Sequence, residues 1–203
     1  APTNALTTPK TPPCIGSMEP VLSAHPVFCV HERVAGTILA AGSSSRLGRP
    51  KQLFDFQGRP RVRAVAEAAL AAGLAPVQVV TGEDAAAVAE ALNGLPVTLV
   101  HNHAWREGQA ASIRAAVAAL PANTGATVFL LVDQPHVPPA LIRALTDAHA
   151  LGLFPVVAPV VGDKRATPIL FDRVTFPNLG ALTGDDGGVA VMARIQMAPG
   201  GHE

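Results

Sequence analysis

The chain has 203 residues, enough for one domain with a sizeable core, and its 15 Lys and Arg residues balance its 15 Asp and Glu residues. This zero formal charge excludes the basic field that nucleic-acid-binding proteins use, so we expect no nucleic acid and no anionic membrane as partner. No apolar segment is long enough to span a bilayer and no signal-peptide pattern is present, so we expect a cytoplasmic protein. Cys14 and Cys29 lack metal-site spacing and are interpreted as incidental thiols.

Residues 1–34 are expected to form a flexible, proline-rich tail. Their Thr-Thr-Pro-Lys-Thr-Pro-Pro run is typical of extended, polyproline-like chain, and the first coherent strand follows it. We expect residues 35–203 to form one domain.

From Gly36 onward, short β-branched runs alternate with Ala-rich helical runs, and Gly73 stands where a helix cap belongs. The alternation calls for right-handed βαβ units, which predicts an α/β fold of three layers with a mostly parallel sheet between helices. In such sheets, ligands bind at the carboxyl ends of the strands. The predicted strands cover residues 38–41, 77–81, 97–100, 127–132 and 156–161, and the predicted helices cover residues 62–72, 83–92, 109–120 and 138–150.

A loop rich in Gly, Ser and basic residues follows the first predicted strand. Gly42 and Gly48 let a ligand approach the main chain, and the serines between them offer hydroxyls and amides. Arg46 and Lys51 add two cations suited to phosphate oxygens. The loop is neither a Walker loop nor a dinucleotide fingerprint, and a plain turn stays open on this composition alone.

Two acidic positions are candidates for holding a metal. Asp133 ends an apolar run, which places its carboxylate at the crevice, where it can share Mg²⁺ with nucleotide phosphates. Asp185 or Asp186, in Gly-Asp-Asp-Gly, could add a second carboxylate. A helix cap or turn is the alternative for Asp133, and a turn is the alternative for the later pair.

Four segments, in order, resemble the MobA-like nucleotidyltransferases, and most closely the molybdenum cofactor cytidylyltransferases. The first is Leu39-Ala-Ala-Gly-Ser-Ser-Ser-Arg-Leu-Gly-Arg-Pro-Lys-Gln-Leu. The others are Asn102-His-Ala-Trp-Arg-Glu-Gly-Gln-Ala-Ala-Ser, Leu131-Val-Asp-Gln-Pro and Leu182-Thr-Gly-Asp-Asp-Gly. Four ordered matches are more specific than any one motif.

The resemblance implies a Rossmann-like nucleotidyltransferase fold whose first loop wraps a nucleoside triphosphate. It implies transfer of CMP from CTP to the phosphate of molybdenum-carrying molybdopterin with release of pyrophosphate, with Mg²⁺ as cofactor. Ala at position 41, where guanylyl members carry Gly, favours CTP over GTP, and a recipient molybdoenzyme is a further expected partner. The implied catalytic residues are Arg46, Lys51 and Asp133, and the implied metal ligands are Asp133 and Asp185. The implied nucleotide-binding residues are Leu39, Ala40, Ala41, Gly42, Ser43, Ser44, Ser45, Gly48, Thr81, Gln109 and Ser112.

Trp105 is interpreted as loop packing, with pterin stacking as the alternative. His101 and His103 are interpreted as part of a solvated turn, and His136 is the one histidine that could touch the pterin side.

The chain departs from the family pattern in two places. Gly188-Val189 stand where the group carries Ala-Arg, and the chain ends without the group's last strand and acidic segment, so we expect a C-terminal end shortened relative to the family. The isoprenoid cytidylyltransferases share the Ala-Ala-Gly loop but differ at Asp-Gln-Pro. Three other functions stay open: a guanylyl transferase, another NTP transferase, and a chaperone that delivers the cofactor without turnover.

Overall fold

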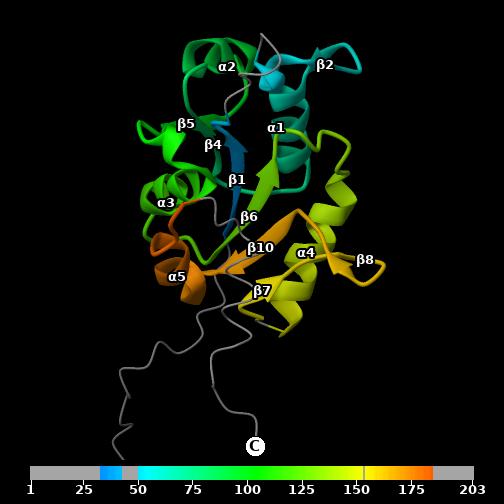
Figure 1. Ribbon diagram of the computed structural model, residues 1–203. Helices are drawn as coiled ribbons and strands as arrows, with labels where there is room; N and C mark the ends of the chain where they lie inside the picture. The colour runs from blue at the N-terminus through cyan, green and yellow to red at the C-terminus, as the bar shows by residue number, and fades with distance from the viewer. Residues whose placement is uncertain (1–32, 43–49, 153, 185–203) are drawn as a thin grey trace, which may run out of the picture.

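The protein was analysed as a computed structural model, which describes residues 33–42, 50–152 and 154–184 (Figure 1). Its centre is a six-stranded sheet in the order β5-β4-β1-β6-β10-β7. The first four of these are parallel: β5 (Val97–His101), β4 (Val77–Thr81), β1 (Val34–Ala40) and β6 (Ala126–Leu131). β10 (Ile169–Asp172) runs antiparallel to both of its neighbours, β6 and β7 (Val156–Val157).

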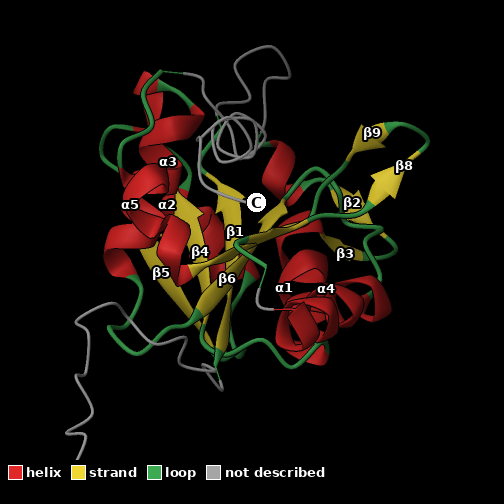
Figure 2. Cartoon of the chain, turned by 90° about the horizontal axis from the view of Figure 1, so that it is seen from below, coloured by secondary structure: helices red, strands yellow, loops and turns green. Residues whose placement is uncertain are grey.

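Helices cover both faces of this sheet, which makes the three layers expected from the sequence. α1 (Arg61–Ala71) and α4 (Pro139–Gly152) lie on one face, and α3 (Gln109–Ala119) and α5 (Phe176–Gly180) lie on the other (Figure 2). α2 (Ala85–Ala91) packs on the α1 face through Val88. The predicted α/β fold with a mostly parallel sheet is therefore confirmed.

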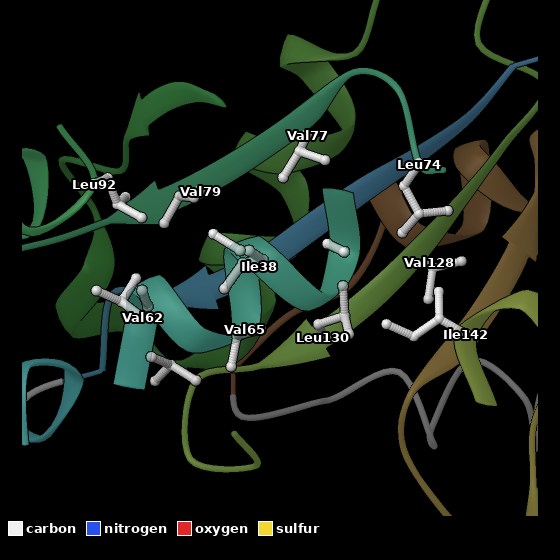
Figure 3. Close-up of a cluster of buried hydrophobic side chains, with 14 of the residues drawn as sticks. Ile38, Val62, Val65, Leu74, Val77, Val79, Leu92, Val128, Leu130 and Ile142 are labelled. Atoms are coloured by element: carbon white, nitrogen blue, oxygen red, sulfur yellow. The ribbon is translucent and has the colours of Figure 1, made fainter. Parts of the chain in front are cut away.

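The core on the α1 face follows directly from side-chain periodicity. Buried positions of α1 recur with helical spacing, and alternate residues of β1, β4 and β6 point to the same face (Figure 3). Ile38 is fully buried beneath this helix, where such a side chain contributes about 1.5–3 kcal/mol. Gly73 lies two residues after α1, and its φ of +87° is the left-handed conformation of a glycine cap, as the sequence predicts.

The predicted buried strand over residues 156–161 is wrong. Only Val156 and Val157 join the main sheet, and Val160 and Val161 form β8 (Val160–Val161), which is exposed and pairs with β9 (Lys164–Arg165). Pro159 separates the two halves, and proline cannot donate to a strand ladder.

Other short elements complete the described chain. None of its helices is long and apolar enough to cross a membrane. These elements are η1 (Lys51–Leu53), β2 (Asp55–Phe56), β3 (Arg59–Pro60), η2 (Trp105–Glu107) and η3 (Arg173–Thr175).

The connections place a ligand crevice between β1 and β6. From β1 the chain moves to β4 and then β5 on one side, and it returns to β6 on the other side of β1. Such a switch point leaves a gap above the carboxyl ends of the two central strands, because their connections diverge.

Candidate active site

A cleft of about 790 Å³ opens at the switch point, a size that suits a nucleotide-sized ligand. β1 and the residues after it supply one wall, β6 and its following turn supply another, and the segment from η2 into α3 closes a third side. The lining residues are Leu39, Ala41, Gly42, Lys51, Glu83, Trp105, Arg106, Gly108, Gln109, Ser112, Leu131, Val132 and Asp133.

Gly42 and Lys51 bring the two ends of the predicted phosphate loop together. A methyl group added at Gly42 would lie 3.7 Å from Lys51 Nζ, so the ammonium stands beside the glycine at the end of β1. Both residues line the cleft. The remaining predicted members of this loop, Ser43, Ser44, Ser45, Arg46 and Gly48, lie outside the described residues.

The side chain of Gln52 is hydrogen-bonded to the backbone where this loop begins. Its Nε2 donates hydrogen bonds of 2.8 Å to the carbonyl oxygens of Ala40 and Gly42. The side chain is 1 % exposed and its bond to Ala40 is buried, so water cannot replace that bond. Gln52 therefore fixes the backbone on both sides of Ala41.

Asp133 stands on the opposite wall, two residues after β6, as the sequence predicts. Its carboxylate is exposed and lines the cleft, and Gln134 beside it accepts a hydrogen bond from the hydroxyl of Thr167. No group of three or more His, Cys, Asp and Glu side chains gathers around a potential metal position in the part of the chain described. Asp133 and Glu83 are the carboxylates among the cleft residues, which suits Mg²⁺ because it takes one or two protein carboxylates together with phosphates.

The wall on the side of β4 contains residues that the sequence did not single out. A Cβ at Gly82 would meet the Ala41 carbonyl oxygen at 2.7 Å and Trp105 Cγ at 3.0 Å, so only glycine lets the indole pack here. The Arg106 guanidinium lies 4.3 Å from the Trp105 ring centroid, and its Nη2 is 3.8 Å from Glu83 Oε1. Loop packing, the favoured interpretation of Trp105, is what these contacts describe.

Two predicted nucleotide-binding side chains, Gln109 and Ser112, come from the first turn of α3. Gln109 is exposed in the cleft, whereas Ser112 is buried and its Oγ accepts a hydrogen bond of 3.1 Å from Asn102 Nδ2. Asn102 Oδ1 in turn accepts from the amide of Ala104 at 3.0 Å. Asn102 thus fixes the turn that leads to Trp105.

Several predicted residues stand apart from the cleft. Ala40 is 2 % exposed with its side chain in the α1-face core, and Thr81 is 1 % exposed, so neither lines the cleft. His101 and His103 are exposed and meet edge to face with ring centroids 4.4 Å apart. Asp185 lies just beyond Gly184, outside the described residues.

A mostly parallel sheet with a polar cleft above its switch point, containing a glycine loop, a lysine and an aspartate, defines the class of Rossmann-like nucleotidyltransferases. Residues 36–198 match the MobA-like NTP transferase domain, and the chain belongs to this family.

Individual relatives agree with this assignment. The chain is 34 % identical over 167 residues to the nicotine blue oxidoreductase of Paenarthrobacter nicotinovorans, covering 79 % of this chain and 81 % of that protein. Rv0371c of Mycobacterium tuberculosis is 30 % identical with a TM-score of 0.72, covering 83 % of this chain and 85 % of that one. A further structure of that protein, at 27 % identity and a TM-score of 0.66 over 82 % and 84 % of the two chains, is a complex with manganese. A nucleotidyl transferase from Methanothermobacter thermautotrophicus is 25 % identical with a TM-score of 0.69, over 81 % and 83 % of the two chains.

Proposed function

We propose that this protein transfers CMP from CTP to the terminal phosphate of molybdenum-carrying molybdopterin and releases pyrophosphate. The observation that carries the proposal is the meeting of Gly42, Lys51 and Asp133 in one cleft at the switch point. A glycine after β1, a lysine of η1 and an aspartate after β6 are suited to transfer between two phosphate compounds.

In this reaction an oxygen of the acceptor phosphate attacks the α-phosphorus of CTP. The new P–O bond forms as the bond to the β-phosphate breaks, and the electron pair leaves with pyrophosphate. Lys51 and Arg46 offset the charge on the phosphates, and the serines with Gly42 and Gly48 enclose them. An acceptor phosphate is already ionised, so the cleft needs no side chain to remove a proton.

Asp133 and Asp185 are the residues that would hold Mg²⁺, and the ion would supply positive charge that offsets the charge of the phosphates. The manganese complex of Rv0371c supports a divalent metal in this family. Leu39, Ala41, Gln109 and Ser112 are the proposed walls of the nucleotide site.

CTP is proposed over GTP because of Ala41. Ala41 lines the cleft, and guanylyl members of the family typically carry glycine at this position, whereas the cytidylyl members that the chain resembles most carry alanine. A transferase for GTP or another NTP, and a delivery chaperone without turnover, are the alternatives. The likeness to a nicotine blue oxidoreductase adds an oxidoreductase as a further alternative.

The first test is the shift in melting temperature with Mg²⁺ and each of CTP, GTP, ATP, UTP and NADPH. A ligand at a hundredfold excess over Kd stabilises the fold by about 2.7 kcal/mol, which shifts Tm by roughly 2–4 °C per kcal/mol in a chain of this size. We expect that, of these five ligands, only CTP raises the Tm, and that it does so only when Mg²⁺ is present. A rise in Tm with GTP would support a guanylyl transferase, and a rise with NADPH alone would support an oxidoreductase. Binding of CTP without release of pyrophosphate would support a delivery chaperone.

Asp133→Ala tests the metal site. We expect this variant to keep its Tm without ligands, because the carboxylate is exposed, and to lose at least about 100-fold in turnover. Pyrophosphate release measures the loss. Asp147→Ala, at an exposed aspartate of α4, is the matched control and is expected to leave turnover unchanged. Normal turnover in Asp133→Ala would remove Asp133 from the site.

A further inference from the structure

A tight turn after β6 presents Asp133 to the cleft. The amide of Gln134 donates a hydrogen bond of 3.1 Å to the carbonyl oxygen of Leu131, which makes Val132 and Asp133 the central residues of the turn. Val132 is buried, whereas Asp133 is exposed and lines the cleft. The carbonyl oxygen of Gln134 accepts a further bond of 3.3 Å from the amide of Val137. The place of the Asp133 carboxylate therefore depends on Gln134, the residue that closes the turn.

The side chain of Gln134 is held by Thr167, a residue 33 positions further along the chain. Thr167 Oγ1 donates a hydrogen bond of 2.5 Å to Gln134 Oε1. Within the described chain, no other side-chain hydrogen bond reaches residues 133–136. One hydroxyl is thus the side-chain link between this turn and the rest of the fold.

Thr167 stands on a well-supported part of the sheet. It lies two residues before β10, whose first residue, Ile169, is 2 % exposed and pairs with Phe129 of β6. Just before Thr167, the amide of Ala166 donates a hydrogen bond of 2.9 Å to the carbonyl oxygen of Pro159, which closes the base of the β8–β9 hairpin. Because β10 runs antiparallel to β6, it begins beside the carboxyl end of β6, where the Asp133 turn lies (Figure 1).

We infer that Thr167 is a positioning residue for Asp133: its hydroxyl holds the Gln134 side chain, and Gln134 fixes the turn that presents the Asp133 carboxylate to the cleft. This inference rests on the proposed function, because it takes Asp133 as a metal ligand. Thr167 does not line the cleft, so it acts on the metal site through Gln134 and Asp133. Loss of a contact that orients a metal ligand typically weakens metal binding about 10- to 100-fold. The lower end applies here, because the contact reaches Asp133 through a neighbouring residue.

The test measures binding of Mn²⁺ to the protein in the presence of CTP, by the relaxation rate of water protons. Mn²⁺ on the slowly tumbling protein raises this rate more than Mn²⁺ on free CTP, so the two complexes are distinguished. Thr167→Val, which removes the hydroxyl and keeps a similar shape, is expected to raise the Kd of Mn²⁺ about 10-fold. The Kd of CTP with a chelator present is expected to stay within about twofold, because Thr167 does not line the cleft.

Two further variants show whether the hydrogen bond itself matters. Thr167→Ser keeps the hydroxyl and is expected to recover most of the affinity for Mn²⁺. Gln134→Leu removes the acceptor and is expected to weaken Mn²⁺ binding at least as much as Thr167→Val. Because both changes break the same bond, the double variant is expected to match Gln134→Leu within about twofold. Additive losses would mean that Thr167 and Gln134 act separately, and would overturn the inference.

Thr175→Val is the matched control, because it removes a threonine hydroxyl bond at the other end of β10. Thr175 Oγ1 donates a hydrogen bond of 2.7 Å to the carbonyl oxygen of Asp172, and Thr175 is 3 % exposed. This change is expected to lower the free energy of unfolding at least as much as the change at the partly buried Thr167. It is expected to leave the Kd of Mn²⁺ within about twofold. Equal losses of Mn²⁺ affinity in both variants would assign the effect to stability and overturn the inference.

Asp133→Ala distinguishes failure of the inference from failure of the proposed function. If the unmodified chain binds no Mn²⁺ in the presence of CTP, the proposed function falls and the inference falls with it. If Asp133→Ala weakens Mn²⁺ binding and Thr167→Val does not, the inference alone is overturned. If Asp133→Ala leaves Mn²⁺ binding unchanged, Asp133 is not a ligand and Thr167 does not position one.

Discussion

At the scale of single residues, Gln52 fixes the backbone from Ala40 to Gly42 at the end of β1, although it does not line the cleft. Its two bonds to the carbonyls of Ala40 and Gly42 use both hydrogens of one amide nitrogen. Its Oε1 is buried and has no hydrogen-bond partner among the described residues. The donor side of this amide is therefore what holds the backbone at Ala40 and Gly42.

We predict that Gln52→Met and Gln52→Glu both lower the free energy of unfolding and weaken CTP binding. Met keeps the shape but removes the donor to the carbonyls of Ala40 and Gly42, the first of which is buried, at about 1–3 kcal/mol. Glu is expected to cost more, because it sets a buried carboxylate against two carbonyl oxygens. Urea unfolding and the Kd of CTP measure the two effects. If Gln52→Glu and the unmodified chain had the same free energy of unfolding, the amide donor of Gln52 would not be needed.

Residues with reactive side chains are the ones that sequence reasoning can find. Lys51 and Asp133 line the cleft, and they were singled out because glycine loops and carboxylates after apolar strands have chemical meaning by themselves. Gln109 also lines it and was expected only from the family resemblance; the roles of all three stay predictions. Gly82 and Arg106 were not predicted, since their importance lies in contacts with Trp105 that only the folded chain shows.

At the scale of elements, a buried polar network joins three strands of the sheet to α3. Gln78 Nε2 of β4 donates to Thr37 Oγ1 of β1 and to the carbonyl oxygen of Ala116, each at 2.9 Å. Thr37 Oγ1 also lies 2.9 Å from Thr127 Oγ1 of β6. All three side chains are at most 3 % exposed, so the network has no access to water.

A double-mutant cycle tests whether this network acts as a unit. Thr37→Val and Gln78→Leu are each expected to destabilise the fold by about 1–3 kcal/mol, because each leaves buried partners unpaired. The double variant should cost less than the sum, by roughly 0.5–3 kcal/mol, since part of the damage is shared. Urea unfolding of the unmodified chain, the two single variants and the double variant gives the coupling free energy between the two side chains. Strict additivity would mean that the bonds are independent.

The element order shows which patterns a sequence reveals. Strands β4 and β6 and helices α1 and α3 were predicted to within a residue or two at each end, because apolar runs and helical spacing mark them clearly. β10 was not predicted, although its Ile169, Leu170 and Phe171 are buried. It runs antiparallel between two strands, a pairing that alternation of strands and helices does not indicate. The prediction of one buried strand over residues 156–161 failed for a similar reason. Valines indicate that a segment is a strand, but they do not indicate which sheet the strand joins.

At the scale of the whole molecule, two apolar cores share one sheet. Val79 of β4 packs in the core beneath α1, and Val80, the next residue, packs in the core beneath α3. Neither helical layer can leave without exposing one face of strands whose opposite face supports the other layer. Between α4 and β10, the part-buried pair of His149 Nε2 and Asp172 Oδ2, 2.8 Å apart, links a helix to the antiparallel part of the sheet.

This arrangement predicts that the domain unfolds as one cooperative unit. Trp105 is the chain's single tryptophan and packs with the α3-face core, so its fluorescence reports the cleft and that layer alone. Far-ultraviolet circular dichroism reports the helices of both layers together. We expect the two urea transitions to coincide, because strands common to both cores couple their loss. With Mg²⁺ and CTP present, both midpoints should rise together by the same amount, because a ligand of the folded state stabilises the whole cooperative unit. A Trp105 transition at lower urea than the dichroism transition would instead show that the cleft side opens before the sheet and the α1 layer unfold.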